Sequence, residues 1–485
     1  MEPNQNRIEI ARSERFSKRI AVCAILISFA FLIPKLIYPR IHFGQMGKQS
    51  FAAQMIESTA KGELAHGVFP FRHFVELDHS GVIPWAEEVP LYSFMSAALI
   101  RAFNLTPIQA GKAWSFIALI FIALGFLRIG KTLKQPQWIF VSIALLFPVF
   151  RLYSVQVMPD LCMTAALVWM LDFALREEIA SAALLLLIAS LFKYYAVFTG
   201  FGLGLYYLYR KNWTAALGLT LVILPCLFYV FWFINLGIPN PITEYRGTDG
   251  HGHLSSIQNI LSGRDWRRVG LWWFGKNASL PGTILALVGA FFTFKTKTTL
   301  RPFWICLWIS FITFPAIFMS SFYVHDYYGL QGSIGIALFA AIGLSKIYEW
   351  DFRLGSLSIG ALLLVSILSV NFMTNYITDF DVIEESLQKL AIPKDSFVLS
   401  VSGISKPVLS FHLGQNAYLV GVDEWSKPKV MERIFDSRIH YAFVHIFKDN
   451  ALALAPIEAG LILGGFKKIE LKLNLTNTVF QAWSR

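Results

Sequence analysis

The chain has 485 residues, of which 55% are hydrophobic and only 15% are charged, and its formal net charge is +11. A soluble domain averages about 25% charged residues, so the composition excludes an ordinary soluble protein and predicts a polytopic membrane protein. The positive charge does not indicate nucleic-acid binding, because Lys and Arg cluster at the ends of apolar runs, where they set the orientation of membrane spans.

About eleven apolar runs approach the length of roughly 20 residues that a helix needs to cross a bilayer. They are Ile20–Tyr38, Ile108–Leu127, Trp138–Tyr153, Val157–Ala174, Ser181–Phe192, Tyr194–Tyr209, Thr214–Leu236, Leu280–Phe294, Phe303–Met319, Leu330–Ile347 and Leu354–Met373. Two runs are separated by Lys193 alone, and one residue cannot reverse a helix, so the turn there must include its neighbours. The sequence therefore predicts an α-helical bundle of about 11 transmembrane helices.

The basic connectors predict the orientation of the bundle. They are the polar N-terminus and the segments Arg128–Lys134, Arg210–Lys211, Lys295–Arg301 and Lys346–Arg353. If these are cytoplasmic, the spans alternate correctly provided that Val89–Phe103, which is only about four helical turns long, does not cross. We expect that segment to be a helix lying on the outer face of the membrane.

With the basic connectors on the cytoplasmic side, the long connectors lie on the outer side of the membrane. A first outer loop (39–107) contains an amphipathic helix at Lys48–Glu63, and a second outer loop spans 237–279. After the membrane domain (1–373), the tail (374–485) alternates helix-like stretches with short apolar strands, which predicts a small extracytoplasmic α/β domain. The expected helices are Val382–Leu390 and Lys427–Phe435, and the expected strands are Phe397–Val401, Ala417–Val420 and Tyr441–Phe447.

A polar pair, His325 and Asp326, lies between two membrane-length runs and is followed by Tyr327 and Tyr328. An ionised side chain at the bilayer centre costs roughly 3 kcal/mol or more, so the pair must meet water or line a cavity. A polar turn whose tyrosines belong to an interfacial aromatic belt is the alternative.

Other polar groups are predicted on the same side, each with two interpretations. Glu88 belongs either to a solvated loop or to a loop that presents carboxylates over a cavity. Asp160 either caps a helix N-terminus or faces a cavity. Lys193 either extends its ammonium to the interface or contacts a phosphate. Arg246, in a loop rich in Arg and Trp, either belongs to an ordinary polar loop or binds phosphate.

The order of these segments resembles that of multi-pass glycosyltransferases of the GT-C fold. Within them it is most similar to the bacterial branch related to protein O-mannosyltransferases and to the aminoarabinose transferase of lipid A. The segments that carry the resemblance are Glu88-Val-Pro-Leu-Tyr92, Met158-Pro-Asp160, Leu191-Phe-Lys193, His325-Asp-Tyr-Tyr328 and, in the tail, His412-Leu-Gly-Gln-Asn416. The resemblance covers nearly the whole chain.

The resemblance implies an enzyme of the bacterial inner membrane that moves a sugar from a polyprenyl phosphate to an acceptor hydroxyl by inverting displacement. The acceptor would be a glycan, a lipid or a protein, and the tail would be periplasmic. A carboxylate must orient or deprotonate the acceptor, and cations or a divalent metal must stabilise the leaving phosphate. The implied catalytic residues are Glu88, Asp160 and Asp326. The implied phosphate-binding residues are Lys193, His325, Tyr327 and Tyr328, with no metal ligands assigned. Arg246 is added as a phosphate-binding residue from its Arg- and Trp-rich loop alone.

The sequence departs from this family at one position. The family's aspartate just after the first span has no counterpart, since Arg40–Gln49 contains no acid. Another carboxylate or His42 must take its role, or the chain has lost transfer activity. An inactive interaction protein of the same fold and a transporter or flippase of lipid-linked sugars therefore remain alternatives.

Overall fold

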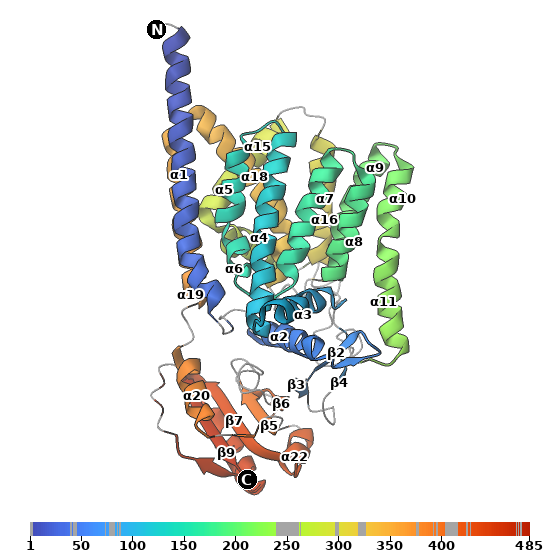
Figure 1. The fold of residues 1–485 in the computed structure, drawn as a ribbon, viewed down its shortest axis with the longest axis vertical. Coiled ribbons are helices and arrows are strands. Elements are labelled where there is room, and N and C mark those ends of the chain that lie inside the picture. The colour runs from blue at the N-terminus through green and yellow to red at the C-terminus, as the bar shows by residue number, and fades with distance from the viewer. Residues whose placement is uncertain are drawn as a thin grey trace. The chain divides into compact units, whose positions relative to one another are not determined.

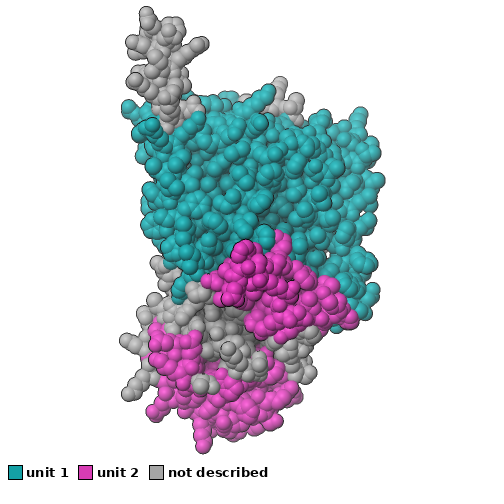
Figure 2. All heavy atoms as spheres, viewed as in Figure 1, with its two compact units in different colours: residues 1–38, 87–92, 112–372 teal, residues 39–86, 93–111, 373–485 magenta. Residues whose placement is uncertain are grey.

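The computed structural model describes most of the chain and divides it into two compact units (Figure 2). The described residues are 3–38, 41, 46–72, 74–76, 83–84, 86, 89–238, 261, 263–295, 300–318, 326–374, 378–390, 392–393, 396–402, 416–422, 425–426, 428–471, 473, 475 and 478–485. The first unit comprises residues 1–38, 87–92 and 112–372, and the second comprises residues 39–86, 93–111 and 373–485. Our division into domains at residue 373 stays a prediction.

The first unit is a helical bundle (Figure 1), and each predicted span coincides with one or two of its helices. In chain order the helices of this unit are α1 (Pro3–Ile37), α4 (Pro107–Thr132), α5 (Gln137–Leu146), α6 (Pro148–Tyr153), α7 (Asp160–Leu175), α8 (Ile179–Phe192), η1 (Tyr194–Ala196), α9 (Val197–Tyr209), α10 (Trp213–Leu221), α11 (Ile223–Asn235), α14 (Gly263–Gly270), η2 (Leu271–Asn277), α15 (Ser279–Lys295), α16 (Arg301–Ile317), η3 (Asp326–Gly329), α18 (Leu330–Trp350) and α19 (Phe352–Thr374).

Fewer helices than predicted are long and apolar enough to cross a membrane. Among the described residues five meet that description, or six if the pair Asp265–Asn277 and Ser279–Lys295, bent by 104°, forms one span. The predicted span Trp138–Tyr153 is two helices, α5 and α6, because Pro148 has no N–H with which to continue the hydrogen-bond ladder. The expected number of about 11 membrane-crossing helices is thus not confirmed, although helices form at every predicted position.

Two helices of the bundle, α15 and α18, approach each other backbone to backbone. A Cβ added at Gly289 would collide with the carbonyl oxygen of Phe339, and one added at Gly343 would collide with that of Leu285. Small residues at a helix interface allow this close packing in a membrane, where lipid gives apolar side chains no reason to associate. The contact fixes α18, whose first turn carries part of the candidate site.

The second unit combines the first loop with the tail. The loop contributes α2 (Met46–Lys61), α3 (Leu91–Phe103) and the three-stranded sheet β1 (Leu64–Ala65), β2 (Phe69–Arg72) and β4 (Ile83–Pro84). Both loop helices were predicted. The tail contributes α20 (Thr378–Gln388), β5 (Phe397–Ser402), β6 (Asn416–Val420), α22 (Pro428–Ile434), β7 (Ile439–Phe447), η5 (Lys448–Ala453), α23 (Leu454–Leu463), β8 (Lys467–Ile469) and β9 (Thr478–Ser484).

The tail strands form a six-stranded sheet in the order β3-β6-β5-β7-β9-β8. Strands β5, β6 and β7 were predicted, whereas β8 and β9 were not. The edge strand β3 (Phe74–Glu76) comes from the first loop and pairs in parallel with β6, with Val75 opposite Tyr418. Val75 and Tyr418 are more than 300 positions apart in the chain, yet they pair in one sheet. Local sequence patterns do not encode such a pairing.

His445 on β7 makes this sheet sensitive to pH. Its side chain is buried and lies near Phe480, and burial lowers the pKa of the imidazole to about 4, while the charge of Asp379 opposes that shift. Because the folded pKa is lower than the unfolded value of 6.5, the unfolded chain binds more protons between these pH values. The stabilisation is complete above pH 6.5 and is lost as the pH falls towards 4.

We expect the melting temperature of the tail to fall between pH 7 and pH 4.5, with up to about 3 kcal/mol lost through His445. His445→Gln removes the titrating group and should flatten that part of the profile. Thermal melts of the full-length protein at several pH values measure both. An identical pH dependence in the two proteins would contradict the assignment.

Candidate functional site

Asp160 is the first residue of α7, and its side chain is fully buried. Pro159 precedes it as the N-cap, and the peptide oxygens of Pro159 and Asp160 accept hydrogen bonds from the Met163 N–H and the Thr164 hydroxyl respectively. The first turn of a helix favours a negative charge. A buried carboxylate nevertheless needs further partners, because its desolvation is costly.

Lys193 is one of these partners. Its ammonium Nζ lies 3.7 Å from Asp160 Oδ2, and its side chain is 4% exposed. The residue ends α8 in an extended conformation, with φ of −151°, and η1 follows it directly. The expectation that the turn must include neighbours of Lys193 is therefore confirmed, and this turn directs the lysine back towards Asp160.

Tyr195 is the second partner. Its hydroxyl donates a hydrogen bond to Asp160 Oδ1, and its ring stacks on Phe314 of α16 at a centroid distance of 5.1 Å. The side-chain amide of Gln331, on α18, donates to the Tyr195 carbonyl oxygen over 2.8 Å. Three helices thus fix the position of the phenol that binds the carboxylate.

The two tyrosines of the predicted His-Asp-Tyr-Tyr element join the same cluster. Lys193 Nζ lies 5.6 Å from the centroid of the Tyr327 ring, within the range of a cation–π interaction. The Tyr328 ring lies 5.2 Å from that of Tyr195 and 4.7 Å from that of Tyr327. We define Asp160, Lys193, Tyr195, Tyr327 and Tyr328 as the Asp160 cluster.

Four other predicted site residues are not placed in this cluster. Glu88, Arg246 and His325 lie outside the described residues, and Asp326 is described only as the backbone residue that begins η3. The described residues contain no group of three or more His, Cys, Asp or Glu side chains able to hold a metal ion.

The sequence pattern missed the residues that connect α4 to this region. The Ser115 hydroxyl donates to the carbonyl oxygen of Gln156 over 2.7 Å and lies 3.3 Å from that of Met158, two residues before Asp160. The Tyr92 hydroxyl lies 3.3 Å from the Ser115 oxygen. Tyr92 is the last residue of the predicted Glu88–Tyr92 segment and belongs to the first unit. Through Ser115, the end of this segment therefore lies near Asp160.

Lys112, one turn before Ser115, was also missed. It is fully buried, and its ammonium donates to the carbonyl oxygens of Tyr38 over 2.7 Å and Lys35 over 3.3 Å. A cation at this position complements the negative end of the α1 dipole and satisfies carbonyls that the helix leaves open. The sequence signal that could have identified Lys112 is a lysine near the start of a long apolar helix.

The fold as a whole is found in solved proteins. No protein-family profile matches the sequence, and no curated protein matches it. The chain is similar to ArnT from Cupriavidus metallidurans bound to undecaprenyl phosphate, with a TM-score of 0.62, 12% identity, and 95% of this chain and 97% of that chain covered. The fold is that of ArnT. The apo state of ArnT gives a TM-score of 0.61 and 13% identity, again covering 95% and 97%.

The resemblance to the aminoarabinose transferase and to the GT-C fold that the sequence motifs predicted is thus confirmed. The arabinofuranosyltransferase AftD from Mycobacteria is also similar, over 97% of this chain and 41% of that chain, at 10% identity and a TM-score of 0.45. The ArnT fold is shared over nearly the full length of both chains.

Proposed function

We propose that the protein is a membrane glycosyltransferase that takes a sugar from a polyprenyl-phosphate donor and attaches it to an acceptor hydroxyl. The main support is the Asp160 cluster, a buried carboxylate held between a lysine and a tyrosine in a chain with the ArnT fold. An ArnT structure contains undecaprenyl phosphate, which supports a polyprenyl phosphate as the lipid partner here.

Asp160 is proposed to orient or deprotonate the acceptor hydroxyl. The Tyr195 hydroxyl donates a hydrogen bond to Oδ1, and the other carboxylate oxygen, Oδ2, lies 3.7 Å from the Lys193 ammonium. That distance is longer than a strong hydrogen bond, so an acceptor hydroxyl can compete for Oδ2. Glu88 and Asp326 remain proposed as further acids of the same site.

Lys193 is proposed to stabilise the leaving phosphate. An ammonium in a buried site acts on a developing negative charge more strongly than it would in water. The Tyr327 ring lies 5.6 Å from this cation, and the Lys193 side chain is only 4% exposed. Arg246 and His325 are proposed to add charge or hydrogen bonds to the phosphate from the adjoining loops.

In this proposal the reaction inverts the anomeric carbon. The acceptor oxygen forms the new C–O bond, the bond between the anomeric carbon and the phosphate oxygen breaks, and polyprenyl phosphate leaves. The hydroxyl proton passes to the carboxylate. We further propose an inner-membrane location with a cytoplasmic N-terminus and a periplasmic tail, on the basis of the basic connectors.

The decisive experiment measures polyprenyl phosphate released by the purified full-length protein. Undecaprenyl phosphate carrying single sugars is supplied with and without an acceptor mixture extracted from the cell envelope. We expect release only when acceptor is present, with equimolar sugar appearing on the acceptor. No release with any donor and acceptor would favour an inactive interaction protein, and movement of intact donor between leaflets would favour a flippase.

A further inference from the structure

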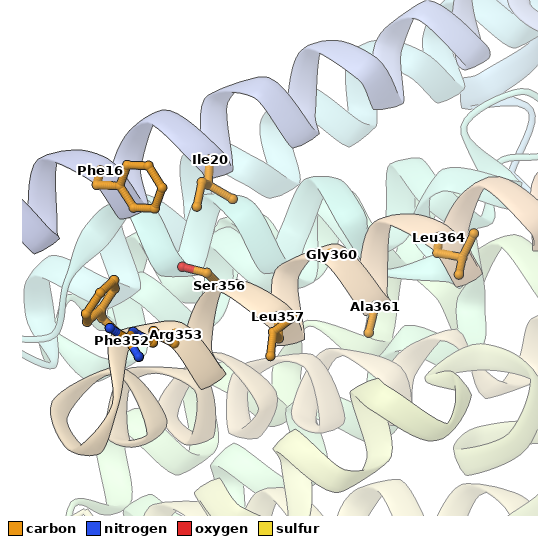
Figure 3. A pocket seen from close by; sticks show the side chains of 9 residues that line it. All are labelled: Phe16, Ile20, Phe352, Arg353, Ser356, Leu357, Gly360, Ala361 and Leu364. Atoms are coloured by element: carbon orange, nitrogen blue, oxygen red, sulfur yellow. The ribbon is translucent and has the colours of Figure 1, made fainter.

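A groove of about 610 Å³ lies between α1 and α19 (Figure 3), apart from the Asp160 cluster. Phe16 and Ile20 line it from α1, and Arg353, Leu357, Gly360 and Leu364 line it from α19. Phe16, Leu357 and Leu364 are more than half exposed. Large apolar side chains exposed along a membrane helix require an apolar partner outside the chain's own core.

The groove has the length of one lipid leaflet. Its residues on α19 recur every three or four positions from Phe352 to Leu364, so they form one face of the helix. At 1.5 Å per residue this face is about 18 Å long. One leaflet contributes about 15 Å of hydrocarbon, whereas a partner transmembrane helix needs a surface along the full thickness of about 30 Å. The dimensions therefore favour an acyl chain over a helix.

Positive charge lies at one end of this groove. Arg353 is exposed, and the carboxylate of the neighbouring Asp351 accepts a hydrogen bond from the Arg353 backbone N–H. Arg19 is also exposed, and it follows Phe16 by three positions, which places it beside the groove on α1. Within the described part of the chain, neither guanidinium forms an ion pair with a carboxylate, so both remain able to bind an anion.

The charged end of the groove lies far from the proposed catalytic site. Gln331 contacts the Asp160 cluster in the first turn of α18, whereas Trp350 ends that helix and precedes Arg353. The 21 residues of α18 cover about 30 Å, which is the thickness of the hydrocarbon core. The groove therefore opens at the membrane face opposite the Asp160 cluster.

We propose that this groove binds one anionic phospholipid of that leaflet. An acyl chain lies between α1 and α19 along Gly360, and the phosphate binds Arg353 with help from Arg19. Zwitterionic lipids can fill the apolar space, but their ammonium group is repelled by the two arginines. Binding would hold α1 against α19 at the charged end of the groove.

The test uses the full-length protein in nanodiscs that contain equal amounts of phosphatidylglycerol and phosphatidylcholine. Native mass spectrometry after release counts the lipids that stay bound. We expect one retained phosphatidylglycerol, and at least a ten-fold preference over phosphatidylcholine. Arg353→Gln should abolish the preference. Gly360→Phe should expel the lipid, because a Cβ at Gly360 meets no atom within 4 Å and the ring can enter the groove without a clash.

Two controls separate this site from general effects. Arg301→Gln removes another exposed arginine, at the start of α16, and should retain phosphatidylglycerol as the unchanged protein does. Leu368→Phe alters an exposed position of α19 beyond the groove and should also have no effect. Equal retention of both lipids by the unchanged protein, or unchanged retention in Arg353→Gln and Gly360→Phe, would overturn the proposal. A dimer held through this face would overturn it as well.

Discussion

Asp160→Asn is expected to lower sugar transfer by about a thousand-fold, because a positioned general base contributes in the range of a hundred-fold to ten-thousand-fold. Asparagine has nearly the same shape and can still accept the hydrogen bond from the Tyr195 hydroxyl. It cannot accept the proton of an acceptor hydroxyl at neutral pH. Initial rates of acceptor-dependent polyprenyl phosphate release measure the effect, and the loss should appear in kcat rather than in KM for the donor.

The matched control for this variant lies on the same helix. Asp172 is also a fully buried carboxylate of α7, and it receives hydrogen bonds of 2.9 Å from both Arg128 and Arg176. Asp172→Asn disturbs a comparable ionic contact three turns away from Asp160, so it should lower the melting temperature while leaving kcat within a few-fold. Equal losses of kcat in Asp160→Asn and Asp172→Asn would show that the aspartates act through stability alone.

Lys193→Met is expected to abolish transfer and also to destabilise the bundle. It removes the ammonium that compensates Asp160, and breaking one side of a buried ion pair costs about 3–5 kcal/mol. The unbranched apolar side chain of methionine is one atom shorter but fills similar space, so the loss comes mainly from charge rather than from a cavity. Thermal unfolding in detergent should show a clearly lower melting temperature than that of the unchanged protein.

The double variant Asp160→Asn with Lys193→Met separates the two roles. Replacing both charges leaves no buried ion without a partner, so the melting temperature should recover most of the loss seen in Lys193→Met. Transfer should remain absent, because neither the base nor the phosphate cation is present. A double variant that regains both activity and stability would show that Asp160 and Lys193 have only a structural role.

Individual residues show which elements of this fold could be predicted from the sequence. The apolar run Ile108–Leu127 and the apolar tail strand Phe397–Val401 were predicted where α4 and β5 lie, because hydrophobic length and pattern are local properties. Pro148 was visible too, but the separation of α5 from α6 at that residue was not predicted. The edge strand Phe74–Glu76 could not be found, because three residues have no distinct pattern until β6 pairs with them.

The sequence by itself determined that this is a membrane protein with helices at the predicted apolar runs, a small α/β tail, and motifs of the GT-C type. Each of these depends on composition or on neighbours along the chain. Only the tertiary structure decided that Asp160, Lys193 and Tyr195 meet. A buried carboxylate needs partners because its desolvation is costly, and here those partners come from other helices. The spacing of residues along one helix does not give the distances between helices.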